Sequence, residues 1–169
     1  GLDPAKDAAR LRSVVGYGPE RNVLPEDMPA SDFVKHLAEV RGMPKSEARG
    51  RASDALWLVG LGEERFRALG TMSTGQRQRV KLAQAIAADP SLVLLDEPTE
   101  GVWIGVIEEI AERLVLLARD MSMIIVEQHV ELALRVAQYA YVMDRGEIAL
   151  EGPSETVKND PQLLRYLAP

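Results

Sequence analysis

The chain has 169 residues, of which 46% are hydrophobic and 27% are charged, and its formal net charge is -6. This composition is typical of a globular protein and argues against wholesale disorder. Because no basic face is evident, the sequence predicts no nucleic-acid partner. The chain contains no cysteine, which excludes disulfides and thiolate metal sites. Apolar runs such as residues 92–95 are far too short to cross a bilayer, so we expect no direct insertion into a membrane.

The N-terminal part of the chain predicts one strand and then two helices. Residues 13–17 have the apolar character of a short strand, and Gly18 and Pro19 stop it. After a loop rich in proline and acidic residues, apolar positions recur at helical spacing up to residue 40, and a second helical pattern begins at Ser46. These two helices predict a small helical subdomain over residues 25–70.

Beyond residue 70, predicted helices and strands alternate. The apolar run at 92–95 is short and continuous, which predicts a strand that is buried on both faces. This alternation is typical of an α/β fold with a parallel sheet. We therefore expect a partial α/β core at 1–24 and 71–152, the helical subdomain at 25–70 and a C-terminal helical tail at 153–169. The remaining predicted elements are helices after Ser73, at 106–119 and at 130–138, strands at 123–126 and 139–143, and a turn at 144–147 that leads into a last strand.

A run of small and polar residues precedes the helix that follows Ser73. Ser73, Thr74, Gly75 and Gln76 stand where backbone N–H groups at a helix start can meet phosphate oxygens, and the serine and glutamine side chains add donors. The alternative is that Ser73 only caps the helix. The residues leave both possibilities open.

Two adjacent carboxylates, Asp96 and Glu97, follow the predicted strand at 92–95. Ligands of open α/β sheets bind at the carboxyl ends of the strands. One carboxylate there can hold Mg²⁺, and its neighbour can take a proton from an attacking water. The alternative is a charged loop after a core strand.

In this order and spacing, the two segments resemble the nucleotide-binding domain of ABC transporters. Residues 73–76 match the family's signature motif, with Thr74 where glycine is commonest, and residues 92–97 match its Walker B strand. The resemblance implies a P-loop NTPase core that binds ATP, with Asp96 as a partner of Mg²⁺ and Glu97 as the general base. It also implies that Ser73, Thr74, Gly75 and Gln76 contact the γ-phosphate of ATP held by the opposite domain of a dimer.

Two further segments fit the same resemblance. Residues 17–20 resemble the Q-loop, which couples nucleotide and Mg²⁺ to the membrane subunit, with Glu20 where glutamine is usual. Residues 124–130 resemble the switch region, in which Gln128 takes the place of the switch histidine and His129 follows it. A glutamine can donate to the γ-phosphate but cannot carry a charge. We expect His36 to be an ordinary histidine on a helix surface or partly buried.

The resemblance changes character near residue 100. Residues 1–99 are similar to transporter ATPases with a Tyr-Gly-x-Pro-Glu loop, whereas residues 99–152 are more similar to branched-chain amino-acid importer ATPases. A recombined or engineered chain and ordinary divergence both explain this change. In the same region, Trp103 and Ile104 either mark a contact surface or pack under the following helix.

The family's phosphate-binding loop, Gly-x-x-x-x-Gly-Lys-Ser/Thr, is not found in the 169 residues, where no lysine follows a glycine. We therefore expect a truncated core with little or no ATPase activity on its own. The expected partners are a second nucleotide-binding domain with a Walker A loop and a membrane permease subunit. The expected location is cytoplasmic, at the inner or plasma membrane through that permease.

Two other functions remain open. The chain could be a non-catalytic interaction module, or an engineered or chimeric scaffold built from ABC ATPase elements. A small Mg²⁺-dependent phosphohydrolase that uses Asp96 and Glu97 ranks last, because two adjacent carboxylates without further ligands make a poor metal site.

Overall fold

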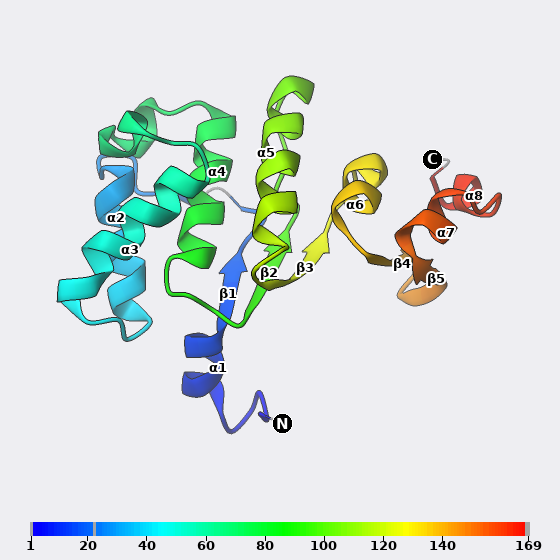
Figure 1. Cartoon of the computed structure of the whole chain (residues 1–169), viewed down its shortest axis with the longest axis horizontal. Helices are drawn as coiled ribbons and strands as arrows, with labels where there is room; N and C mark the ends of the chain where they lie inside the picture. The colour runs from blue at the N-terminus through cyan, green and yellow to red at the C-terminus, as the bar shows by residue number, and fades with distance from the viewer. Residues whose placement is uncertain (1, 22, 168–169) are drawn as a thin grey trace. The chain divides into compact units, whose positions relative to one another are not determined.

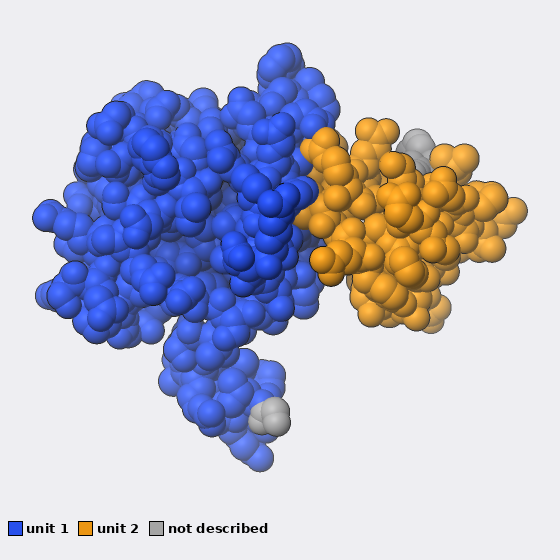
Figure 2. Space-filling view, viewed as in Figure 1, with its two compact units in different colours: residues 1–126 blue, residues 127–169 orange. Residues whose placement is uncertain are grey.

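The computed structural model describes residues 2–21 and 23–167. The chain forms two compact units, residues 1–126 and residues 127–169 (Figure 2). The first unit contains α1 (Ala8–Val14), β1 (Val15–Gly18), α2 (Ala30–Val40), α3 (Lys45–Leu58), two short 3-10 turns (Glu63–Phe66 and Leu69–Thr71), α4 (Thr74–Ile86), β2 (Leu92–Asp96), α5 (Ile104–Leu117) and β3 (Ser122–Val126). The second contains α6 (Val130–Val136), β4 (Tyr139–Asp144), β5 (Glu147–Pro153), α7 (Ser154–Lys158) and α8 (Leu163–Leu167).

The first unit is built on a parallel sheet in the order β1-β2-β3 (Figure 1). Val15 pairs with Leu92, and Leu92 pairs with Ser122, so the three strands start nearly level and their carboxyl ends share one edge. Helix α4 packs on β1 and β2. The approach is so close that a Cβ atom at Gly16 would overlap the carbonyl group of Ala85. The predicted parallel sheet is confirmed.

Only one face of the sheet is packed, which corrects the prediction of a strand buried on both faces. Along β2, Val93 and Leu95 are buried, while Leu92, Leu94 and Asp96 are half-buried. Side chains alternate between the faces of a strand, so the alternation means that neighbours cover one face much better than the other. In β3, Ile124 remains 52% exposed. A continuous apolar run therefore did not imply burial on both sides.

Helices α2 and α3 pack against each other and against α4. Their contact uses small and branched side chains, such as Val34, Ala52 and Leu56. Each helix ends at a glycine with a positive φ angle, 99° at Gly42 and 78° at Gly60. The amide that follows each glycine donates to a carbonyl five residues earlier, which is the Schellman ending that glycine favours. The two predicted helices are confirmed.

The start of the chain differs from the prediction. Residues 8–14 form helix α1, and β1 begins only at Val15. The β-branched pair Val14-Val15 suggested one strand over 13–17, but Val14 is the last helical residue. The apolar pattern alone did not separate a helix end from a strand start.

The second unit folds around a hairpin of β4 and β5. Its turn residues Arg145 and Gly146 both have positive φ angles, 51° and 85°, as a two-residue hairpin turn of type I′ requires. This confirms the predicted turn, although the strands form their own antiparallel sheet. Leu134, Val157 and Leu163 form the core of this unit. In the described part of the chain, no helix combines the length and apolarity needed to cross a membrane.

Candidate functional site

The N-terminus of α4 has the cap that its sequence predicts. The Ser73 hydroxyl oxygen accepts from the Gln76 N–H at 3.2 Å, and the Gln76 Oε1 accepts from the Ser73 N–H at 3.0 Å. This reciprocal pair is a capping box. It uses only acceptor atoms of the two side chains, so the serine hydroxyl hydrogen and the glutamine amide hydrogens can still donate to a ligand. Capping and anion binding are therefore compatible here.

The start of α4 lies against the loop that follows β2. A Cβ atom at Gly75 would come within 2.5 Å of Val106 Cγ1, so only glycine allows α4 and α5 to approach this closely. A Cβ atom at Gly101 would lie 3.8 Å from Thr74 Cγ2. The segment 73–76 and the loop after the acidic pair thus form one continuous surface, although they are distant in the sequence.

Glu97 has an unusual backbone conformation at the carboxyl end of β2. Its φ angle is 46°, in the left-handed region, which costs a non-glycine residue about 1–2 kcal/mol. Its N–H donates to the Val126 carbonyl oxygen at 2.9 Å, and its own carbonyl oxygen accepts from the Glu100 N–H at 3.1 Å. Asp96 accepts from the Tyr17 hydroxyl at 3.3 Å. Backbone strain of this kind gathers at functional sites.

Three carboxylates converge at this edge of the sheet. Glu20, Glu97 and Glu100 each have a carboxylate oxygen within 4.8 Å of the others. The predicted site residues Glu20 and Glu97 are therefore brought together from two loops, and Glu100 is a member that the sequence did not predict. Clustered carboxylate oxygens are the donor set that Mg²⁺ prefers, so the residues fit the cation that the family resemblance implies. Asp96 directly precedes Glu97 but is outside this triad.

Two buried polar residues of α4 reach the loops that carry the triad. Lys81 is 3% exposed, and its ammonium donates to the Glu20 carbonyl oxygen at 2.7 Å. Burial lowers the pKa of Lys81, and the carboxylates of Glu100, Glu20 and Asp96 oppose that shift. Gln78 is also 3% exposed, and its Nε2 donates to the Glu100 carbonyl oxygen at 2.9 Å. The sequence analysis missed both residues, although polar residues at i and i+3 among apolar positions were a usable signal.

Other predicted positions are not members of the triad. Gln128 and His129 belong to the second unit, where both backbone N–H groups donate to Glu127 Oε1, at 3.0 and 3.1 Å. The role of Gln128 stays a prediction. His36 is exposed on α2, as expected. Trp103 and Ile104 are 76% and 61% exposed, so the interpretation that they pack under the following helix is wrong.

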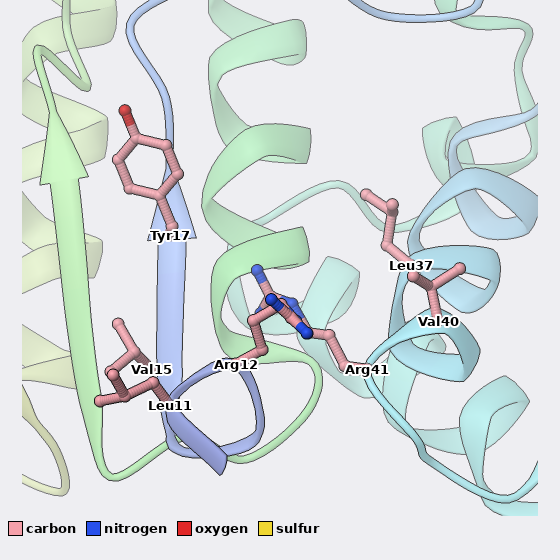
Figure 3. Close-up of a pocket in the computed structure, with 7 residues that line it drawn as sticks. All are labelled: Leu11, Arg12, Val15, Tyr17, Leu37, Val40 and Arg41. Atoms are coloured by element: carbon pink, nitrogen blue, oxygen red, sulfur yellow. The ribbon is translucent and has the colours of Figure 1, made fainter. Parts of the chain in front are cut away.

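A separate cavity of about 490 Å³ opens between α1, β1 and α2 (Figure 3). Its lining is mostly apolar, with two arginines. The Arg41 guanidinium donates to the carbonyl oxygens of Gln84 and Ala85 at 3.3 and 3.2 Å, and burial lowers its pKa. None of the predicted site residues lines this cavity, whose lining is Leu11, Arg12, Val15, Tyr17, Leu37, Val40 and Arg41.

Solved structures with the same fold are known. The chain superposes on cbiO1 from Clostridium perfringens with a TM-score of 0.79 and 24% identity, covering 92% of this chain and 63% of that one. The dimeric structure of MJ0796, a bacterial ABC transporter cassette, matches with a TM-score of 0.77 and 24% identity over 90% of this chain and 68% of that one. These matches confirm the predicted α/β class with a parallel sheet.

Sequence relatives agree with the structural matches. The glutamine transport ATP-binding protein GlnQ of Escherichia coli K12 is 37% identical over 162 residues, which is 94% of this chain and 68% of the relative. The arginine transport ATP-binding protein ArgV of Corynebacterium glutamicum is 33% identical over 159 residues, which is 93% of this chain. The chain spans 63% of the length of ArgV and 62% of the L-cystine transport protein TcyN of E. coli K12, less than two thirds of each. The family model for ABC transporters matches residues 2–100, more than half of the chain, and the protein therefore belongs to the ABC transporter family.

Proposed function

We propose that this chain is part of the ATP-binding subunit of an ABC transporter, in which it supplies a signature motif and a Walker B site for ATP hydrolysis. One observation carries the proposal. The carboxylates of Glu20 and Glu97, from two loops far apart in the sequence, meet beside Asp96 at the carboxyl edge of the parallel sheet. This is the edge at which α/β proteins bind their ligands.

In this proposal Glu97 is the general base that takes a proton from the attacking water. Its fixed backbone, held by the hydrogen bond to Val126, supports the precise positioning on which phosphoryl transfer depends. Asp96, which the family resemblance makes the partner of Mg²⁺ although it is not a member of the triad, would hold the ion together with Glu20 of the triad. When bound, Mg²⁺ offsets the negative charge of the phosphates. Tyr17 orients the Asp96 carboxylate through its hydroxyl. Gln128, from the second unit, would contact the γ-phosphate as a hydrogen-bond donor.

The signature motif would act on ATP that is held by a second domain. Ser73 and Thr74 are exposed at the start of α4, where the serine hydroxyl, the Gln76 amide and the helix N-terminus all favour an anion. Gly75 keeps this helix start close to α5. Trp103 ends the loop that follows Glu97, and Ile104 begins α5. Their exposed side chains extend the surface that would contact the second domain.

A phosphate-binding loop must come from outside these 169 residues, because no lysine in them follows a glycine. The ATP that the signature motif meets would be held by the phosphate-binding loop of a second nucleotide-binding domain, and we assign the coupling to transport to a membrane permease subunit at the cytoplasmic face. Residues 25–70 would be the helical subdomain between the two parts of the core.

For the transported substrate, we propose only a chemical class. Relatives are named for the transport of arginine, L-cystine, glutamate or aspartate, and glutamine, which favours import of an amino acid. Residues 99–152 resemble importers of branched-chain amino acids, and this narrower assignment rests on those residues alone.

The test is complementation in trans. A complete nucleotide-binding domain whose own signature serine is replaced by arginine should have little ATPase activity. Adding this chain should restore activity, because only its signature motif is needed at the partner's ATP. In the chain, Ser73→Arg should abolish the restored activity. Glu97→Gln should leave it unchanged, because the general base at the partner's ATP is the partner's own, and Glu97 would act only on ATP bound beside its own strand.

Calorimetry of the chain alone provides the second readout. Mg-ATP should not bind more tightly than about 0.1 mM, which corresponds to roughly 5.5 kcal/mol, and Glu97→Gln should behave in the same way. Tighter binding would overturn the claim that the phosphate-binding loop comes from elsewhere. Complementation that survives Ser73→Arg would instead favour a non-catalytic interaction module.

A further inference from the structure

Helix α4 connects the signature motif to both loops of the carboxylate triad through two buried side chains. About two turns beyond Ser73, the Lys81 ammonium donates to the main-chain carbonyl of Glu20 at 2.7 Å. One turn earlier, the Gln78 amide donates to the main-chain carbonyl of Glu100 at 2.9 Å. Both side chains are 3% exposed, so neither contact is an incidental surface hydrogen bond.

Burial of the Lys81 ammonium costs free energy, which indicates that the contact has a specific role. A buried ammonium loses its hydration, and the fold must supply compensating partners. Here the compensation comes from a carbonyl oxygen and from the carboxylates of Glu20, Asp96 and Glu100, which lie within electrostatic reach. A methionine of similar length would fill the same space without this cost. A lysine that served only to fill space would thus be a poor choice.

The bond joins α4 to the loop that follows β1. Glu20 is exposed and lies just beyond the end of β1, at Gly18. Its carboxylate nevertheless reaches within 4.8 Å of those of Glu97 and Glu100, although three like charges repel one another. A fixed positive charge beneath the loop offsets this repulsion, and a hydrogen bond to the main chain sets the direction of the loop.

We propose that Lys81 is a positioning residue, which ties the Glu20 loop to the signature helix and so holds the Glu20 carboxylate in the triad with Glu97 and Glu100. Its importance for catalysis rests on the proposed function, but the mechanical role does not require nucleotide. The same helix presents Ser73 to the partner's ATP, so a shift of α4 would be passed directly to the Glu20 loop. Because its side chain is 3% exposed, Lys81 would act on catalysis through Glu20.

Nuclear magnetic resonance on the full chain tests the mechanical role. In the wild type, the Glu20 amide should have an order parameter of about 0.85, and Lys81→Met should lower it below about 0.6, the range of flexible backbone. Lys81→Arg, which keeps the charge and the donors, should restore the order of the loop. Lys45→Met, the same change at an exposed lysine of α3, is the matched control.

Paramagnetic broadening by Mn²⁺ separates this inference from the proposed function. The amide signals of Glu20, Glu97 and Glu100 should broaden together in the wild type, and the Glu20 signal should lose most of its broadening in Lys81→Met. Equal order parameters at Glu20 in the wild type and Lys81→Met would overturn the role of Lys81. Absence of broadening in the wild type would count against the metal site and leave the order-parameter result to decide on Lys81.

Discussion

The two faces of the parallel sheet contrast sharply, although the same strands form both. On the face under α4, Gly16, Val93 and Leu95 are buried, and the helix backbone comes so close that Gly16 has no room for a Cβ atom. On the opposite face, Tyr17 and Ile124 remain 43% and 52% exposed. The side chains on both faces are apolar. The difference in burial therefore shows that packing partners, and not the composition of the strands, decide which residues stabilise the fold.

The hairpin of the second unit repeats the contrast. Ala140, Val142 and Leu150 pack against the small core of Leu134, Val157 and Leu163. On the other face, Tyr139 and Tyr141 are exposed and lie with their ring centroids 5.1 Å apart. If the contrast is correct, equivalent substitutions on the two faces should have very different costs.

The largest effect is expected at Gly16. Gly16→Ala places a Cβ atom against the carbonyl group of Ala85, and backbone atoms of a packed helix cannot move aside cheaply. We expect a loss of about 3 kcal/mol or more in the free energy of unfolding, measured by urea titration. Gly18→Ala is the control, because the close contact of its Cβ atom would be with the end of the Leu95 side chain, at 2.9 Å, which can move aside, so this variant should cost less. Equal losses would show that the close backbone contact does not limit packing.

Two neighbouring leucines of β2 give the most direct comparison of the faces. Leu95→Ala, on the packed face, should lose about 2–5 kcal/mol, since it removes a side chain that is 2% exposed and leaves a cavity. Leu94→Ala, on the open face, should lose about 1 kcal/mol or less, since no closed cavity forms. Thermal and urea unfolding measure both. Similar losses would contradict the difference between the faces.

A smaller effect is expected at the start of α4. Ser73→Ala removes one half of the capping box and should cost about 0.5–2 kcal/mol of stability. Ser73→Asn keeps a capping oxygen and should retain most of the stability while it loses complementation in trans. If the two variants unfolded alike, Ser73 would not act as a cap.

The smallest effect concerns pH and the open face of the hairpin. Partial burial, followed by the Glu151 carboxylate and Tyr141, raises the pKa of Tyr139 above its usual value. The raised pKa favours the protonated phenol in the folded state. The resulting stabilisation is therefore present below the unfolded pKa and is lost as pH rises through the folded pKa. Burial and the Asp96 carboxylate also raise the pKa of Tyr17, so titration of tyrosine absorbance should show a late component to which both residues contribute. Tyr139→Phe should remove part of this component, and an unchanged late component would contradict the shift at Tyr139.

Local signals in the sequence determined much of this protein. The sequence predicted the two helices within residues 25–70, the cap at Ser73, the hairpin turn within 144–147 and the acidic pair after β2, because each depends on residues only a few positions apart. The motif spacing was also sufficient to identify the family, which the comparisons confirmed.

Tertiary structure alone decided which apolar face of the sheet is packed and which carboxylates meet. Glu20, Glu97 and Glu100 come together because parallel strands bring their carboxyl ends to one edge, a relation between segments that no short window of sequence contains. Lys81 and Gln78 gained their partners in the same way, when α4 crossed beneath two loops. Local preferences set each element, whereas burial and long-range hydrogen bonds exist only after the elements have packed.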